Sequence, residues 1–376
     1  MLKLACVLLL ATNALAVDLK GTEIVMTFLV HRHGDRTPVE PTLSFSTNPI
    51  KLAELTMPYG YGQLTKAGKT RAYKLGQFIR NRYRFISPQY NRSEVYIRST
   101  DSTRAKMTVL SVLAAMYPAT EKLFDEDIKW TPVPYTTVPM KYDFNLATLN
   151  CPVFSNNYIN LLPASSDYMS THGPAVDLLA KQTSRHVSQL TPTLAFAIVD
   201  VYNSQLSLGM PLNNEIDAAW PELQAAAGAA IDIVFGDENY IALEAGVLLN
   251  EFYKAASGVI SGTESRRFWI YSGHDLNVYG LTAVTKVTER QGVPKYASAY
   301  ALELRKVVET GKYVVVPVYL PSPGEELKYL EIEGCGTVCD YQQFVNITSK
   351  YALDETTWRA RCGFSDDLVF DEDHLA

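Results

Sequence analysis

A histidine between two arginines is the part of this chain best suited to chemistry. It lies in the heptad Arg-His-Gly-Asp-Arg-Thr-Pro at positions 32–38, directly after an apolar run over residues 24–30. Two fixed positive charges beside an imidazole lower its pKa, so His33 stays neutral and keeps a nucleophilic lone pair. The guanidinium groups of Arg32 and Arg36 also match the geometry of phosphate oxygens. The heptad therefore predicts phosphoryl chemistry with a histidine as nucleophile.

Two further segments carry charged residues where a predicted strand meets a predicted helix. One is Tyr96–Asp101, which contains Arg98, and the other is Tyr271–Asp275, where a glycine precedes His274 and Asp275. In open α/β sheets, ligands bind beyond the carboxyl ends of the strands, where helix N-termini attract anions. We therefore expect these segments to meet the heptad at one edge of a sheet.

The elements that must position these residues follow an alternating pattern. Runs rich in β-branched and aromatic residues predict strands at Glu23–His31, Glu94–Arg98, Phe268–Tyr271, Ala299–Leu304 and Tyr313–Tyr319. Apolar residues three and four apart predict a helix over Leu64–Tyr83, and a second helix is expected from Thr100 or Asp101 to Met116. This alternation predicts an α/β fold with a mostly parallel sheet flanked by helices.

The pattern changes in the middle of the chain. Between residues 151 and 257 strand-like runs largely vanish, and Gly173–Gln189 and Ile241–Ala256 have a helical pattern. We therefore expect an inserted, mainly α-helical cap domain at residues 150–257. The α/β domain would then consist of residues 17–149 and 258–376.

The first residues have the pattern of an export signal. Lys3 is followed by the apolar run Leu4–Ala11 and by Ala14-Leu15-Ala16, an Ala-x-Ala cleavage site, which predicts a signal peptide over residues 1–16. No later run reaches the roughly 18 apolar residues of a membrane span. The formal charge of −6 argues against a general affinity for nucleic acid or anionic membranes.

Cysteine usage fits an oxidising compartment. Removal of the signal takes Cys6 and leaves Cys151, Cys335, Cys339 and Cys362, an even number that predicts two disulfides. Three pairings can form; the short glycine-containing loop favours Cys335–Cys339, which leaves Cys151–Cys362. A zinc site is the rival interpretation, but it lacks a second close pair of ligands. Two sequons, at Asn91 and Asn346, are candidate glycosylation sites.

The three chemical segments together resemble the histidine acid phosphatases. The heptad matches that family's Arg-His-Gly-x-Arg-x-Pro signature, and Ser272–Asp275 is similar to its second, His-Asp signature. Val95–Asp101 resembles a third segment of the prostatic and lysosomal branch. These motifs stand in the family's order over nearly the whole chain after the signal. The resemblance implies a phosphoglycerate mutase-like (histidine phosphatase) fold.

The resemblance also implies a role for each motif residue. His33 would attack phosphorus and become phosphohistidine, and Asp275 would protonate the leaving alcohol. The phosphoryl oxygens would be held by four residues, namely Arg32, Arg36, Arg98 and His274. The substrate would be a small phosphomonoester, no metal or other cofactor is expected, and activity should be highest in mild acid. Relatives of this kind are commonly dimers, so a homodimer is a further expectation.

Three residues or features near the motifs receive structural interpretations. Arg104, a helical turn beyond Asp101, is expected to be an ion-pair partner and not a phosphate ligand. His31 stands where the family usually has an apolar or aromatic residue, and we expect it to pack behind the site. The vertebrate secreted relatives tie the cap to the sheet domain with a third disulfide, which this chain lacks, so a more mobile cap is expected.

Other functions compete with a secreted acid phosphatase. A metal-dependent phosphatase needs clustered ligands, whereas the histidines here are scattered apart from His31 and His33. A catalytically weak protein that binds small ligands in the phosphatase pocket is the main alternative. Phytase-like branches often replace the His-Asp pair with His-Ala-Glu, whereas this chain has Asp275. The lysosomal branch often ends in a membrane anchor. Because no such anchor is expected in this sequence, a secreted form is favoured over a lysosomal one.

Overall fold

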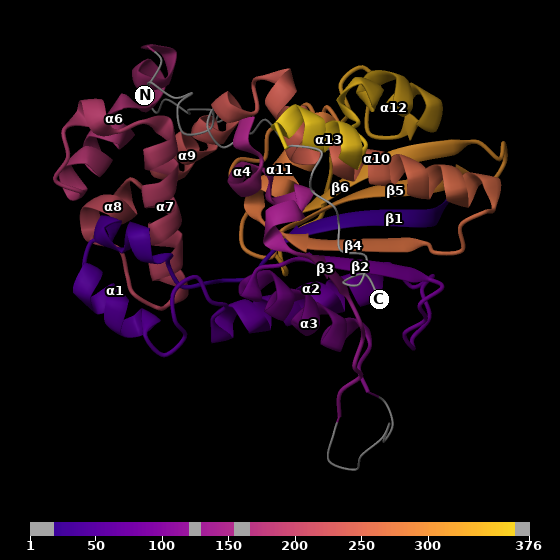
Figure 1. Ribbon diagram of the computed structural model, residues 1–376, viewed down its shortest axis with the longest axis horizontal. Helices are drawn as coiled ribbons and strands as arrows, with labels where there is room; N and C mark the ends of the chain where they lie inside the picture. Colours follow the sequence, from indigo (N-terminus) through magenta and orange to yellow (C-terminus); the bar gives the residue numbers. More distant parts are fainter. Residues whose placement is uncertain (1–18, 120–128, 154–165, 365–376) are drawn as a thin grey trace, which may run out of the picture.

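The computed structural model describes residues 19–119, 129–153 and 166–364, and one mixed sheet lies at its centre (Figure 1). The strands follow the order β3-β2-β4-β1-β5-β6-β7, and β8 pairs with β6. Their bounds are β1 Thr22–Arg32, β2 Val95–Thr100, β3 Thr136–Val138, β4 Phe268–Gly273, β5 Ala299–Val307, β6 Tyr313–Leu320, β7 Lys328–Tyr329 and β8 Cys339–Asp340. All five predicted strands are confirmed, and the short strands β3, β7 and β8 are additional to them.

The half of the sheet that carries the motifs is parallel. Strand β4 pairs in parallel with both β1 and β2, and β2 with β3, whereas β5, β6, β7 and β8 join in antiparallel pairs. In the β1–β4 register, Arg32 lies opposite Gly273. The carboxyl ends of β1, β2 and β4 therefore meet at one edge, as the strand–helix pattern predicted.

Helices cover both faces of the sheet, which confirms the predicted fold class. One face is covered by α2 (Lys66–Arg82) and α3 (Thr103–Met116), and the other by α10 (Glu238–Ser261), α11 (Asp275–Val284), α12 (Tyr341–Thr348) and α13 (Glu355–Cys362). Strand β1 contributes side chains to both hydrophobic layers, because successive side chains of a strand point to opposite faces of the sheet. Met26, Phe28 and Val30 pack on the side of α10, and Leu29 packs on the side of α2.

A smaller group of helices forms the cap beside the sheet (Figure 1). The cap consists of α6 (Ser166–Gln182), α7 (Pro192–Ser207), α8 (Asn214–Ala218) and α9 (Trp220–Val234), which share a hydrophobic core. Helix α1 (Pro49–Thr56) packs against it, because Leu52 contacts Val201. The remaining short elements are η1 Glu40–Phe45, η2 Met140–Tyr142, η3 Phe144–Leu146, α4 Ala147–Asn150, η4 Val187–Gln189 and η5 Ser349–Tyr351.

Helix α10 lies elsewhere than the expected domain boundary implies. Residues 241–256 were expected in the cap, yet α10 packs on the sheet, where Phe252 meets the ring of Phe28 at 5.9 Å between centroids. The helical pattern identifies α10 as a helix with a broad apolar surface, but it does not tell which neighbour covers that surface. We therefore propose that the cap ends before α10 and not at residue 257.

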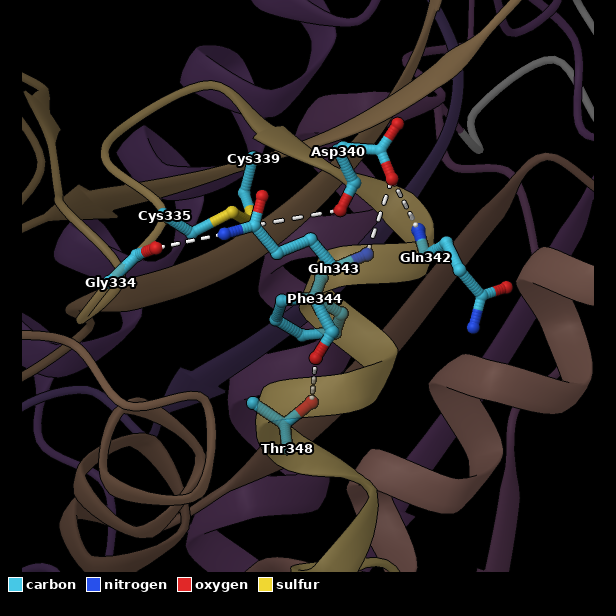
Figure 2. The surroundings of a disulfide bond; sticks show 8 residues. All are labelled: Gly334, Cys335, Cys339, Asp340, Gln342, Gln343, Phe344 and Thr348. Carbon is cyan, nitrogen blue, oxygen red and sulfur yellow. Dashed lines mark hydrogen bonds between the residues drawn. A yellow bond between two sulfur atoms is a disulfide. The ribbon is translucent and has the colours of Figure 1, made fainter.

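Both predicted disulfides are present. Cys151–Cys362 joins the end of α4 to α13 across a sequence separation of 211, and Cys335–Cys339 closes a separation of only 4. Figure 2 shows the second bond beside α12, where Asp340 accepts hydrogen bonds from the backbone of Gln342 and Gln343. The short bond therefore fixes the loop that leads into the helix.

Several expectations concern surface or terminal features. The predicted signal peptide and Cys6 lie outside the described residues, whereas Asn91 and Asn346 are both exposed. Among the helices that the structure describes, none combines the length and apolar character needed to cross a membrane.

The long disulfide should contribute more stability than the short one, because a longer closed loop loses more entropy when it is cross-linked in the unfolded chain. Replacing Cys151 and Cys362 together by alanine should lower the free energy of unfolding by about 2–5 kcal/mol. Replacing Cys335 and Cys339 together by alanine should lower the free energy of unfolding by a smaller amount. Urea denaturation of the two double variants measures the difference, and an equal or reversed loss would contradict the argument.

His31 is a buried titratable group within β1. Its side chain is 0% exposed, its Nδ1 lies 3.1 Å from the carbonyl oxygen of Arg32, and its Nε2 has no hydrogen-bond partner among the described residues. Burial lowers the pKa of His31 to about 4, although the backbone hydrogen bond opposes the shift. As expected, His31 is packed within the structure.

The low pKa of His31 makes the fold less stable in acid. Since the unfolded histidine takes up a proton near pH 6.5 and the folded one only near pH 4, stability is lost as the pH falls between these values. At pH 5 the loss from this residue is about 2 kcal/mol relative to pH 7. In His31→Leu, the drop in unfolding free energy from pH 7 to pH 5 should shrink by that amount. His186→Leu, which changes an exposed histidine, should leave the drop unchanged.

Candidate active site

Two strand ends bring the two signatures together. The backbone N–H of His33, just beyond β1, donates to the carbonyl of Gly273 at the end of β4 over 2.9 Å. The rings of His33 and His274 consequently lie edge to face, with 5.4 Å between their centroids. Helix α2 approaches closely from the side, because a Cβ on Gly34 would lie 2.4 Å from the carbonyl oxygen of Gly68. Only glycine permits this approach.

The hydrogen bonds of His33 select its tautomer. Its Nδ1 lies 2.8 Å from the carbonyl oxygen of Gly34, which can only accept, so Nδ1 carries the hydrogen and Nε2 keeps the lone pair. The side chain is buried. Burial, followed by the charges of Arg104 and Arg32, holds the pKa of His33 well below its usual value of 6.5. The ring is thus neutral in mild acid and has a free, nucleophilic nitrogen.

Three arginines surround this ring with hydrogen-bond donors. The Nε atoms of Arg32, Arg36 and Arg104 are buried and have no hydrogen-bond partner among the described residues. Buried donors without partners are unfavourable, more so on charged groups. An anion with several oxygens would satisfy all three groups at once. Arg32 is additionally held over the ring of Tyr296, 4.4 Å from its centroid.

Arg32 and Arg36 point into the molecule and do not pair with their neighbour in the sequence. Asp35 instead accepts two hydrogen bonds from Arg71 on α2, at 2.6 and 3.2 Å. The carboxylate of the signature therefore anchors α2 and leaves the two arginines to the site.

His274 and Asp275 occupy the first positions of α11. The Nδ1 of His274 lies 3.4 Å from a guanidinium nitrogen of Arg104, which can only donate, so its Nε2–H faces Thr100 Oγ1 at 3.0 Å. Burial and then Arg104 hold the pKa of His274 well below 6.5. Asp275 forms an ion pair with Arg32, 2.9 Å between Oδ2 and Nη2.

A cavity of about 160 Å³ opens beside this pair of residues. Its lining includes Asp275, His274, Arg104, Leu146 and Thr148. The general acid that the resemblance implies thus faces a space that can hold part of a small molecule.

The structure places Arg98 and Arg104 differently from what the sequence analysis expects. Arg98 donates to Asp143 over 2.7 Å and lies over the ring of Phe144, 4.3 Å from its centroid, whereas Arg104 contacts His274 within the site. Asp101, one helical turn before Arg104, forms an ion pair with Lys106. The side chains of a strand alternate between its faces, so a position near a strand end does not say which way a guanidinium points.

A signal for Arg104 is present in the sequence. It stands in the first turn of α3, where the positive end of the helix dipole disfavours a cation. A cation in that position suggests that another interaction holds it there. The arginine beyond the strand end, and not the one within the strand, thus joins His33.

The site also contains a residue that sequence reasoning missed. Asp200, on cap helix α7, forms ion pairs with Arg32 and Arg36. A single aspartate within a helical segment has no sequence pattern that would single it out.

The chain has clear relatives among known proteins. It matches the Histidine phosphatase superfamily (branch 2) over residues 23–316. It is 30% identical over 360 residues to the prostatic acid phosphatase of Bos taurus, covering 91% of this chain and 88% of that protein. It is 28% identical to the lysosomal acid phosphatase of Rattus norvegicus, covering 91% of this chain and 80% of that protein.

Solved structures agree at the level of the fold. The Hafnia alvei phytase in complex with myo-inositol hexakis sulphate superposes with a TM-score of 0.64 at 14% identity, covering 90% of this chain and 99% of that one. The phytase from Citrobacter braakii gives a TM-score of 0.63 at 15% identity, covering 89% and 99%. With the family match extending over most of the sequence, this chain belongs to the histidine phosphatase superfamily, branch 2.

Proposed function

We propose that this protein is an acid phosphatase that hydrolyses small phosphate monoesters through a phosphohistidine on His33. The observation that carries the proposal is the position of Arg104, Arg32 and Arg36 around a neutral, buried imidazole, with the Nε–H of each arginine unpaired among the described residues. Phosphoryl transfer depends mainly on positioning and on stabilising charge at the oxygens, which such donors supply. The acid phosphatases among the relatives support this activity.

In the first step the lone pair on Nε2 of His33 attacks phosphorus. The Nδ1–H bond to Gly34 holds the ring in the tautomer that this attack requires. Arg32, Arg36 and Arg104 hold the phosphoryl oxygens, and His274, whose ring lies edge to face with that of His33, lies beside the same group. The bond to the ester oxygen breaks, and protonated Asp275 transfers its proton to the leaving alcohol.

In the second step water replaces the alcohol. Asp275, now a carboxylate, accepts a proton from the water while the oxygen of that water attacks phosphorus. The P–N bond breaks, its electron pair returns to Nε2 of His33, and inorganic phosphate is released. The cavity beside Asp275 suits the leaving alcohol in the first step and water in the second.

Mild acid favours this mechanism for a reason that concerns His33. Burial and the surrounding arginines keep its pKa well below 6.5, so the nucleophile remains unprotonated in mild acid, where the proposed mechanism needs a proton donor for the leaving alcohol. A maximal rate above about pH 8 would contradict the assignment of a carboxylic acid as proton donor.

We also propose a secreted, metal-independent enzyme. The predicted signal peptide, the two disulfides and the exposed sequon residues Asn91 and Asn346 support passage through an oxidising compartment. The relatives include both prostatic and lysosomal enzymes, and the secreted form is the one we favour. A homodimer, common in such enzymes, is the expected assembly.

The nucleophile and the acid should respond differently to substitution. In the presence of EDTA, His33→Ala should lose at least about 10³-fold in turnover and all phosphoenzyme, because no other nucleophile replaces it. Asp275→Ala should lose about 10²- to 10⁴-fold with an alkyl phosphate, whose leaving group needs a proton, and less with p-nitrophenyl phosphate. Phosphate release and acid-quenched labelling measure both effects. Phosphate binding without turnover in the wild type would favour the ligand-binding alternative.

A matched pair of arginine variants tests which of Arg98 and Arg104 holds the phosphoryl oxygens. Arg104→Lys should lower kcat/KM by about 10²-fold, because lysine keeps the charge but loses the planar set of donors. Arg98→Lys, which preserves the pairing with Asp143, should change kcat/KM by no more than about threefold. Steady-state kinetics in mild acid measure both losses. A larger loss of kcat/KM in Arg98→Lys than in Arg104→Lys would show that Arg98 is the phosphate ligand.

A further inference from the structure

One face of cap helix α7 is turned toward the signature heptad. Asp200, Ser204 and Ser207 are spaced by four and three residues, so they project from the same side of the helix. The hydroxyl of Ser204 accepts a hydrogen bond from Arg36 Nη1 at 3.2 Å, and that of Ser207 donates to the Arg36 carbonyl at 3.2 Å. Although no third disulfide ties the cap to the sheet domain, this face attaches α7 directly to the site.

Asp200 makes the closest of these contacts. Its Oδ1 lies 3.3 Å from Arg32 Nη2 and its Oδ2 lies 2.5 Å from Arg36 Nη2, with the side chain only 16% exposed. One carboxylate therefore bridges two guanidinium groups through separate oxygens. Two oxygens of a phosphoryl group would make the same kind of bridge.

The charges at the site are nearly balanced before any ligand binds. Arg32, Arg36 and Arg104 contribute three positive charges, against two carboxylates, Asp200 and Asp275. The negative charge of Asp275 disappears when it carries the proton for the leaving group. Burial alone would raise the pKa of Asp200, but Arg36 and Arg32 outweigh it and lower the value, so this carboxylate stays ionised in mild acid.

We propose that Asp200 is a specificity-determining residue that weakens the binding of inorganic phosphate, the product. The proposal rests on the function proposed above. An incoming phosphate must displace the carboxylate from at least one of Arg32 and Arg36, because it would otherwise bind beside a like charge. Asp200 thus limits product inhibition and speeds the release of phosphate.

Removing this charge should strengthen phosphate binding. In Asp200→Asn the inhibition constant of inorganic phosphate should fall by about tenfold or more, as expected for a like charge removed a few ångströms away. The KM of the substrate should fall with it, and kcat should not rise, because the release of phosphate becomes slower. Asp177→Asn, an exposed aspartate of α6, removes the same charge from the cap and should leave the constant unchanged.

The outcomes separate this proposal from the proposed function. An active wild type whose inhibition constant stays the same or rises in Asp200→Asn would show that Asp200 positions the arginines and does not compete with phosphate, which overturns the inference. A wild type without phosphatase activity would instead overturn the function. Asp200→Glu, which retains the charge, should keep a weak affinity for phosphate.

A structure of the wild type with bound phosphate gives a test that needs no folded variant. The carboxylate of Asp200 should have moved out of ion-pair distance from at least one of Arg32 and Arg36. If it keeps both ion pairs while phosphate occupies the remaining donors, the proposed displacement is wrong. In that case phosphate and Asp200 would share the arginines without competing.

Discussion

Arg32, Arg36 and Arg104 repel one another, yet their side chains converge on the buried ring of His33. Burial, followed by the charge of Arg36, lowers the pKa of Arg104 to about 10, which reflects this repulsion. The same charges keep the imidazole neutral. In such a site the positive charges and hydrogen-bond donors of the arginines lack partners, and an anion supplies them. The carboxylates of Asp200 and Asp275 provide part of that compensation in the free protein.

The rest of the structure serves to hold these charges in place. Parallel strands β1 and β4 end at the same edge, so the backbone bond from His33 to Gly273 fixes the two signatures relative to each other. Close approach of α2 at Gly34 fixes the heptad from the other side. Helix α3 contributes Arg104, and the cap contributes Asp200. The charges thus come from several different elements, and only the packed core keeps them together.

Neutral buried histidines bring a conflict between stability and working conditions. Burial lowers the pKa of His31, His33 and His274, so each favours the unfolded chain as the medium becomes acidic. The two disulfides act in the opposite direction, since they constrain the unfolded chain at any pH. An anion bound to the arginines stabilises the folded protein as well, by mass action. Stability in acid therefore depends both on groups at the site and on features far from the reacting atoms.

The sequence by itself determined the α/β class, the five strands, the two disulfides and the motifs that contain His33, His274 and Asp275. These features depend on local periodicity, on short spacings and on an even cysteine count, all of which can be read along the chain. The resemblance carried by the motifs determined the family. It assigned Arg98 to the phosphate and Arg104 to an ion pair, but the direction in which each side chain points cannot be read along the chain.

Only the tertiary structure paired Arg98 with Asp143, put Arg104 beside His274, placed α10 on the sheet and brought Asp200 to the arginines. The physical reason is the same in each case. A helix or strand pattern gives the spacing of side chains within one element, but not which surface of another element they meet. The charge balance of the site depends on such contacts between elements, because its charged groups come from the heptad that ends β1 and from α3, α7 and α11.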